Sequence, residues 1–123
     1  IVLIPAIKPD VAIFHAPMAD RHGNVWIGRR RELAAMAYAS TTTLVTVERV
    51  VENDLLADEV TAAGTLPALY VSDIAVAPNG AWPYGLWGEY PTDTEEILRY
   101  ARAARTEAGF ADYIAGRMRE VAA

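Results

Sequence analysis

Short apolar runs rich in β-branched residues alternate along the chain with stretches of helical composition. Thr42–Val47 is the clearest such run and predicts a central strand, and Val11–Ala16, which follows Pro9, predicts a buried strand. Arg30–Ala39 has helical composition, and another apolar run covers Leu69–Val76. Alternating strands and helices are typical of βαβ units. We therefore expect an α/β fold whose mainly parallel sheet is flanked by helices.

Helix start signals mark two further segments. Asn53 or Asp54 can cap a short helix that runs to about Ala62. Thr92 and Glu95 have the spacing of a capping box and predict the start of a helix, and a further apolar stripe predicts a final helix after it. Because no linker, internal repeat or low-complexity tract interrupts the pattern, we expect residues 1–123 to form a single domain or one half of a two-lobed domain.

The composition excludes several classes of function. The chain has no cysteine, which excludes disulfides, thiolate zinc sites and a cysteine nucleophile. Its net charge of −5, without a basic stripe, argues against nucleic acid and anionic membranes as partners. The sequence has no apolar run long enough to span a membrane, no zinc-binding spacing and no nucleotide-binding glycine motif, and we expect no signal peptide. We expect a cytoplasmic protein without a metal.

One candidate site lies where the first predicted strand meets a polar turn. His15 is near the end of that strand, and Asp20 and Asn24 belong to the turn Asp20-Arg-His-Gly-Asn24. Ligands of α/β sheets gather beyond the carboxyl ends of strands, so these three side chains are candidates for substrate binding. The alternative is structural: His15 as a hydrogen-bonded core imidazole, with Asp20 and Asn24 bonded to nearby backbone.

A second candidate is the long glycine-, proline- and aromatic-rich segment Pro78–Pro91, here called the aromatic loop. Long loops in compact domains are often functional. Trp82 and Tyr84 are suited to an acyl-binding wall or a subunit contact. Simple capping of the core by the tryptophans is the alternative.

Four pieces of the sequence, spread over most of the chain, carry a family resemblance. They are the segment KPDVAIFHAPMADRHGNV from Lys8 to Val25, Leu44–Glu48, the Asp73 strand with the aromatic loop, and Arg105–Phe110. Together they resemble the A subunits of family I CoA-transferases, in the glutaconate CoA-transferase branch. The resemblance implies a partial domain of the NagB/RpiA/CoA-transferase-like fold, aligned with the C-terminal portion of a larger A subunit.

This resemblance implies an enzyme that transfers CoA between carboxylic acids through a glutamyl-CoA intermediate. The nucleophilic glutamate is expected on a partner B subunit, so this chain alone should be inactive; Glu48 and Glu89 are weak local candidates for that role. Coenzyme A enters as a substrate, no cofactor is expected, and the protein should be a hetero-oligomer that binds acyl-CoA and carboxylic acids.

Two alternatives remain open. One is a hydrolase on the same scaffold that opens rings in CoA-linked intermediates, and the other is a catalytically silent scaffold or interaction subunit. Related A subunits often show Gly-Ala-His-Pro where this chain has Gly80-Ala-Trp-Pro83, and this departure favours a changed substrate.

Overall fold

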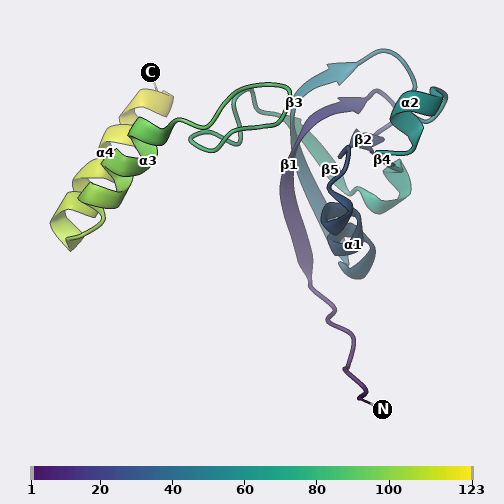
Figure 1. The fold of residues 1–123 in the computed structure, drawn as a ribbon, viewed down its shortest axis with the longest axis horizontal. Coiled ribbons are helices and arrows are strands. Elements are labelled where there is room, and N and C mark those ends of the chain that lie inside the picture. The colour runs from purple at the N-terminus through teal and green to yellow at the C-terminus, as the bar shows by residue number, and fades with distance from the viewer. Residues whose placement is uncertain (1, 123) are drawn as a thin grey trace. The chain divides into compact units, whose positions relative to one another are not determined.

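The computed structural model describes residues 2–122, without the side chains of residues 121 and 122, and shows two compact units. The first, Ile1–Gly80, is built on a five-stranded sheet, and the second, Ala81–Ala123, holds most of the aromatic loop and two helices (Figure 1). Whether residues 1–123 act as one domain stays a prediction. The strands of the first unit are β1 (Val11–Asp20), β2 (Val25–Trp26), β3 (Thr42–Val51), β4 (Thr65–Leu66) and β5 (Asp73–Val76); its helices are α1 (Arg31–Ala39), α2 (Glu59–Ala62) and the 3-10 turn η1 (Ala68–Tyr70).

The sheet has the strand order β4-β2-β1-β3-β5, and its three longest strands, β1, β3 and β5, are parallel. The α/β fold with a mostly parallel sheet is therefore confirmed. The two-residue strands β2 and β4 differ, because β2 pairs antiparallel with β1 and with β4. The turn after Asp20 is too short for a parallel crossover, so the chain can only return beside β1 in the opposite direction.

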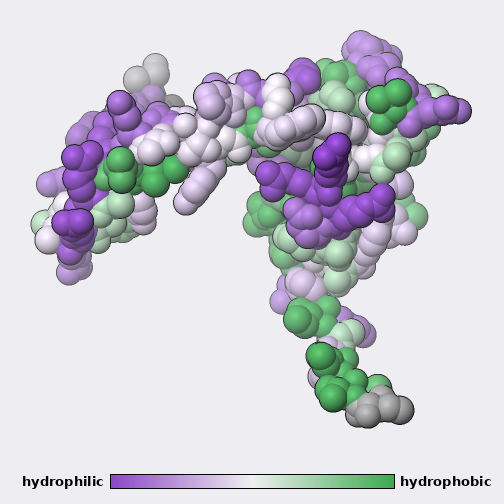
Figure 2. Space-filling view, viewed as in Figure 1, coloured by the Kyte–Doolittle hydropathy of each residue, from purple (hydrophilic) through white to green (hydrophobic). Residues whose placement is uncertain are grey.

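One face of the sheet carries the core of the first unit. Alternate side chains of β1 and β3 point to this face, where α1 packs through Ala37 and the partly buried Leu33 and Ala34. On the opposite face, Val11 and Ile13 of β1 are 47% and 67% exposed. The apolar segment before β1 is also exposed (Figure 2). The buried core consists of Phe14, Ala16, Ala19, Val25, Ile27, Ala37, Val45, Val47 and Leu66.

One sequence prediction in this unit was wrong, and one predicted apolar run contains two elements. The short helix begins after Asp58, whose carboxylate accepts the Val60 N–H at 2.8 Å, whereas Asp54 closes a separate turn through the Leu56 N–H. The run Leu69–Val76 is not one strand, because Pro67 opens the 3-10 turn η1 and only Asp73–Val76 pairs with β3. Local apolar content alone does not distinguish these conformations.

The second unit contains α3 (Thr94–Ala103) and α4 (Glu107–Ala122). The rings of Tyr100 and Tyr113 connect the two helices, with their centroids 5.4 Å apart. Asp93 caps α3 by accepting the Glu96 N–H at 3.0 Å, so the prediction of Thr92 as the cap was wrong by one residue. Thr92 Oγ1 instead accepts the Gly85 N–H at 2.9 Å inside the loop. No helix between residues 2 and 122 is long and apolar enough to cross a membrane.

Candidate functional site

A row of polar side chains crosses β1 and β3 on the sheet face opposite the core. His15 of β1 lies in register with Thr46 of β3, and both side chains share this face with Glu48. His15 Nδ1 is 2.8 Å from Thr46 Oγ1, and His15 Nε2 is 2.7 Å from Glu48 Oε1. An ionised carboxylate only accepts hydrogen bonds, so His15 Nε2 is the donor to Glu48, and the direction of the bond between Nδ1 and the Thr46 hydroxyl follows from the tautomer of the ring. Both ring nitrogens are therefore occupied.

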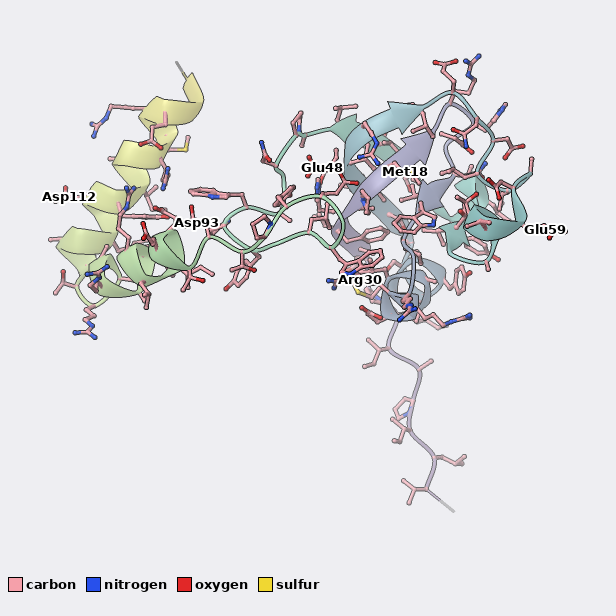
Figure 3. All side chains as sticks on the ribbon, turned by 45° about the horizontal axis from the view of Figure 1, so that its top comes forward. Met18, Arg30, Glu48, Glu59, Asp93 and Asp112 are labelled. Atoms are coloured by element: carbon pink, nitrogen blue, oxygen red, sulfur yellow. The ribbon has the colours of Figure 1, made fainter. Side chains whose placement is uncertain are left out.

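The turn that follows β5 closes over this row. The Ala77 N–H donates to the Val47 carbonyl at 2.8 Å and so extends the parallel pairing by one residue. The Asn79 N–H then donates to Glu48 Oε2 at 2.7 Å, with Asn79 in a left-handed conformation at φ 59°. Glu48 (labelled in Figure 3) therefore joins His15 to the turn from which the aromatic loop continues.

Gly80 completes this turn by direct contact with the imidazole. A Cβ atom at Gly80 would lie 2.6 Å from His15 Cε1 and 2.7 Å from His15 Nδ1. Those separations are too short for any side chain, so only glycine fits here. The side chains of His15 and Glu48 are each 11% exposed. The two polar groups are enclosed by their hydrogen-bond partners and by the turn.

Asp20 and Asn24 form a second buried polar group, at the end of β1. The Asp20 carboxylate accepts the Leu55 N–H at 3.0 Å and the Asn24 side-chain amide at 2.8 Å, together with the backbone N–H groups of His22 and Asn24. Asn24 Oδ1 accepts the Ala68 N–H at 2.9 Å. Burial raises the pKa of the Asp20 carboxyl, but these hydrogen bonds outweigh it and hold the pKa below its ordinary value.

These contacts give Asp20 and Asn24 a structural task. The two residues are 2% and 6% exposed, and their side chains connect the turn after β1 to the chain before α2 and to η1. Direct substrate binding by His15, Asp20 or Asn24 stays a prediction. Sequence reasoning named His15 and Glu48 separately, and the structure places them in contact.

The aromatic candidates Trp82 and Tyr84 belong to the second unit. Trp82 Nε1 donates to Asp93 Oδ2 at 3.2 Å, and the Arg117 guanidinium carbon lies 4.5 Å from the centroid of the Trp82 ring. Tyr84 is 66% exposed. The backbone N–H of Glu89 closes a turn onto the Leu86 carbonyl at 3.0 Å. A fixed indole and an exposed phenol are thus available in the loop.

Sequence reasoning missed a charged cluster that supports Trp82. Glu96 of α3 is 6% exposed; it accepts the Tyr113 hydroxyl at 2.6 Å and forms an ion pair with Arg117 of α4. Burial raises the pKa of Glu96, but the hydrogen bonds from Tyr113 and Arg117 lower it below its ordinary value. Glu96 in turn raises the pKa of Arg117. The four-residue spacing of Tyr113 and Arg117 predicts that both lie on one face of a helix, but no local pattern predicts that this face packs against α3.

The comparisons with known proteins point to one family. A sequence profile described as "Coenzyme A transferase" matches residues 1–77. The chain is 30% identical over 112 residues to the A subunit of glutaconate CoA-transferase from Acidaminococcus fermentans, with 89% of this chain and 34% of that protein covered. It is 33% identical over 115 residues to the A subunit of 3-oxoadipate CoA-transferase from Pseudomonas knackmussii, with 90% and 39% covered.

A further relative and two solved structures extend this similarity. The cholesterol ring-cleaving hydrolase IpdA subunit of Rhodococcus jostii is 30% identical over 119 residues, with 94% of this chain and 40% of that protein covered. A crystal structure of a variant of the decarboxylase AibA/AibB superposes with a TM-score of 0.79 at 34% identity, over 93% of this chain and 40% of that one. The glutaconate coenzyme A-transferase of Acidaminococcus fermentans superposes with a TM-score of 0.77 at 27% identity, over 91% and 35%.

The chain thus spans between about a third and two fifths of the length of these relatives. Similarity over nine tenths of this chain, together with the matching fold, shows that the chain is A-subunit-like and belongs to the coenzyme A transferase family, family I.

Proposed function

We propose that this chain is the C-terminal portion of an A subunit in the glutaconate CoA-transferase-like branch. With a B subunit it transfers CoA between carboxylic acids. The observation that carries the proposal is the similarity to two CoA-transferase A subunits over about 90% of the chain. The subunit relatives support a B-subunit partner, and acyl-CoA and carboxylic acids are then the substrates.

The proposed reaction begins with a glutamate carboxylate attacking the acyl-CoA thioester. The carbon–sulfur bond breaks, and an acyl-glutamyl anhydride and the CoA thiolate form. The thiolate then attacks the glutamyl carbonyl, releases the first carboxylic acid and leaves a glutamyl-CoA thioester. A second carboxylate takes up the CoA by the reverse of these two steps. Coenzyme A is therefore a substrate, and the protein needs no cofactor.

The hydrogen bonds of Glu48 support a nucleophilic glutamate that comes from another polypeptide. Its two carboxylate oxygens accept hydrogen bonds from His15 and from the Asn79 N–H, at 2.7 Å each. Hydrogen bonds to a carboxylate stabilise its charge and reduce its reactivity as a nucleophile. The geometry therefore suits Glu48 to holding a turn.

The open sheet face supports a larger assembly. Val11 and Ile13 lie on the same face as His15 and are exposed, and apolar patches of this kind on a protein surface mark interaction sites. In the proposed enzyme, other parts of the A subunit or the B subunit cover this face.

A hydrolase subunit on the same scaffold is the second candidate. The 30% identity to a ring-cleaving hydrolase subunit over 94% of the chain supports it. The resemblance to A subunits that often have a histidine at this position makes the fixed indole of Trp82 a second point in favour of a changed substrate. A catalytically silent scaffold is the third candidate.

The test is to purify the A subunit that contains this chain with its B subunit, then to assay acyl-CoA turnover with and without a carboxylic acid acceptor. The proposal predicts CoA transfer that requires the acceptor. It also predicts that Glu48→Gln keeps turnover within about tenfold of wild type, because the chemistry resides elsewhere. Turnover without any acceptor would favour the hydrolase. A complex that only assembles, with neither activity, would favour the scaffold.

A further inference from the structure

The His15–Glu48 pair resembles a catalytic relay at first sight. Thr46, His15 and Glu48 lie in the order hydroxyl, imidazole and carboxylate, with separations of 2.8 and 2.7 Å. Such an order is used to activate a hydroxyl nucleophile. The surroundings of the imidazole argue for another role.

The imidazole has no ring nitrogen that faces open space. Nδ1 and Nε2 are both within hydrogen-bond distance of protein groups. The edge formed by Cε1 and Nδ1 is covered by Gly80, where even a methyl group would not fit. A relay also has partners on both ring nitrogens. The feature that argues against one is therefore the Gly80 turn, which covers the edge of the ring next to the Thr46 hydroxyl.

The Glu48 carboxylate is what the imidazole holds in place. Oε1 receives the bond from His15, and Oε2 receives the Asn79 N–H. Asn79 is left-handed, a conformation that asparagine adopts more readily than other non-glycine residues, and a hydrogen bond to its N–H restrains the turn further. The bond from Glu48 supplies such a restraint at the point where the chain leaves β5 for the aromatic loop.

From this geometry we infer that His15 is a positioning residue. It orients Glu48, and Glu48 holds the Ala77–Gly80 turn from which the aromatic loop continues. The part of this inference that concerns catalysis rests on the proposed function, with the aromatic loop as its acyl-binding wall: the turn prepares acyl-CoA binding and takes no part in bond making. His15 therefore sets KM for the acyl-CoA, and kcat is set elsewhere.

Two substitutions at position 15 separate the two bonds of the imidazole. The amide nitrogen of glutamine can occupy the place of Nε2 and donate to Glu48. The amide of asparagine reaches only the place of Nδ1, beside Thr46. His15→Gln should therefore preserve the turn and His15→Asn should release it. Thr46→Val is the matched control, because it removes the hydroxyl from the relay but leaves the bonds of Glu48 intact.

The experiment uses the full-length A subunit in complex with its B subunit. Hydrogen exchange is measured in the peptide that covers residues 78–91, and KM and kcat are measured on the same preparations. We expect His15→Asn to raise exchange in that peptide about tenfold, the effect of losing one charge-assisted hydrogen bond. Peptides from β1 and β3 should not change. KM should rise about tenfold with kcat within about threefold, and His15→Gln and Thr46→Val should stay near wild type.

Three results would overturn the inference. Exchange in residues 78–91 that is unchanged in His15→Asn would show that the pair does not hold the turn. A loss confined to kcat, together with inactivity of Thr46→Val and loss of the acid limb of the pH–rate profile, would show a relay. An equal rise of exchange and of KM in His15→Gln and His15→Asn would show that the bond from His15 to Glu48 does not hold the turn. If the wild-type complex shows no CoA transfer, the proposed function fails, and the exchange comparison still decides whether the turn is held.

Discussion

Replacing Gly80 with alanine should destabilise the first unit by steric contact alone. The new Cβ would lie 2.6 Å from His15 Cε1, 2.7 Å from His15 Nδ1 and 2.8 Å from the Ala77 carbonyl oxygen. Two of the three neighbours belong to a ring held at both nitrogens, so the turn itself has to move. Overpacking of this kind costs about 1–3 kcal/mol. We expect a loss of about 2 kcal/mol in the free energy of unfolding, measured by urea denaturation followed by circular dichroism.

The matched control is Gly116→Ala in α4. A Cβ at Gly116 meets no atom within 4 Å, and alanine is favoured over glycine inside a helix, so this change should be neutral or stabilising by up to about 1 kcal/mol. In a His15→Ser background the imidazole contacts disappear, and the cost of Gly80→Ala should fall to about half. A cost below about 0.5 kcal/mol in the wild-type background, or an equal cost in both backgrounds, would refute this reasoning.

Three further predictions concern the other polar groups. Asp20→Ala should lower the free energy of unfolding by about 2–4 kcal/mol, because several buried N–H donors lose their acceptor. The pKa of Asp20 in the folded protein lies below its ordinary value of 3.8, so the stability that its charge contributes is present above that pH and is lost as the pH falls below it. Asp20→Asn should therefore flatten the acid limb of a curve of unfolding free energy against pH. Asp93→Ala should raise hydrogen exchange in the first turn of α3, which mass spectrometry of that peptide can measure. Arg117→Met should make Trp82 more accessible to acrylamide in a variant whose other tryptophans are phenylalanine; unchanged quenching would argue against the contact between the two side chains.

The fold class was predictable from the sequence because the clearest local patterns, the β-branched runs, form the central strands of the sheet. The β-branched run from Thr42 forms the central strand β3, and the run from Val11 forms β1 beside it. The errors fall where several polar residues compete to cap one turn. Asn53, Asp54 and Asp58 are all able to cap a helix, and the choice depends on which N–H groups the rest of the fold leaves free.

The contacts of the candidate site were less accessible to sequence reasoning. His15 and Glu48 are 33 residues apart, and their contact depends on the register of β1 and β3, which no local pattern reveals. The role of Gly80 depends on the approach of a turn to an imidazole on another strand. The dipeptide Asn79-Gly80 is typical of a turn, and it is the local pattern from which the turn after β5 could be predicted.

The most direct test of the central claim is to find which polypeptide carries the covalent intermediate. The complex of the two subunits is incubated with acyl-CoA, trapped with borohydride or hydroxylamine, digested and mapped by mass spectrometry. The proposed function predicts a modified glutamate in the B subunit but none in this chain. A modified Glu48 or Glu89 would contradict it, because the attacking carboxylate would then belong to this chain.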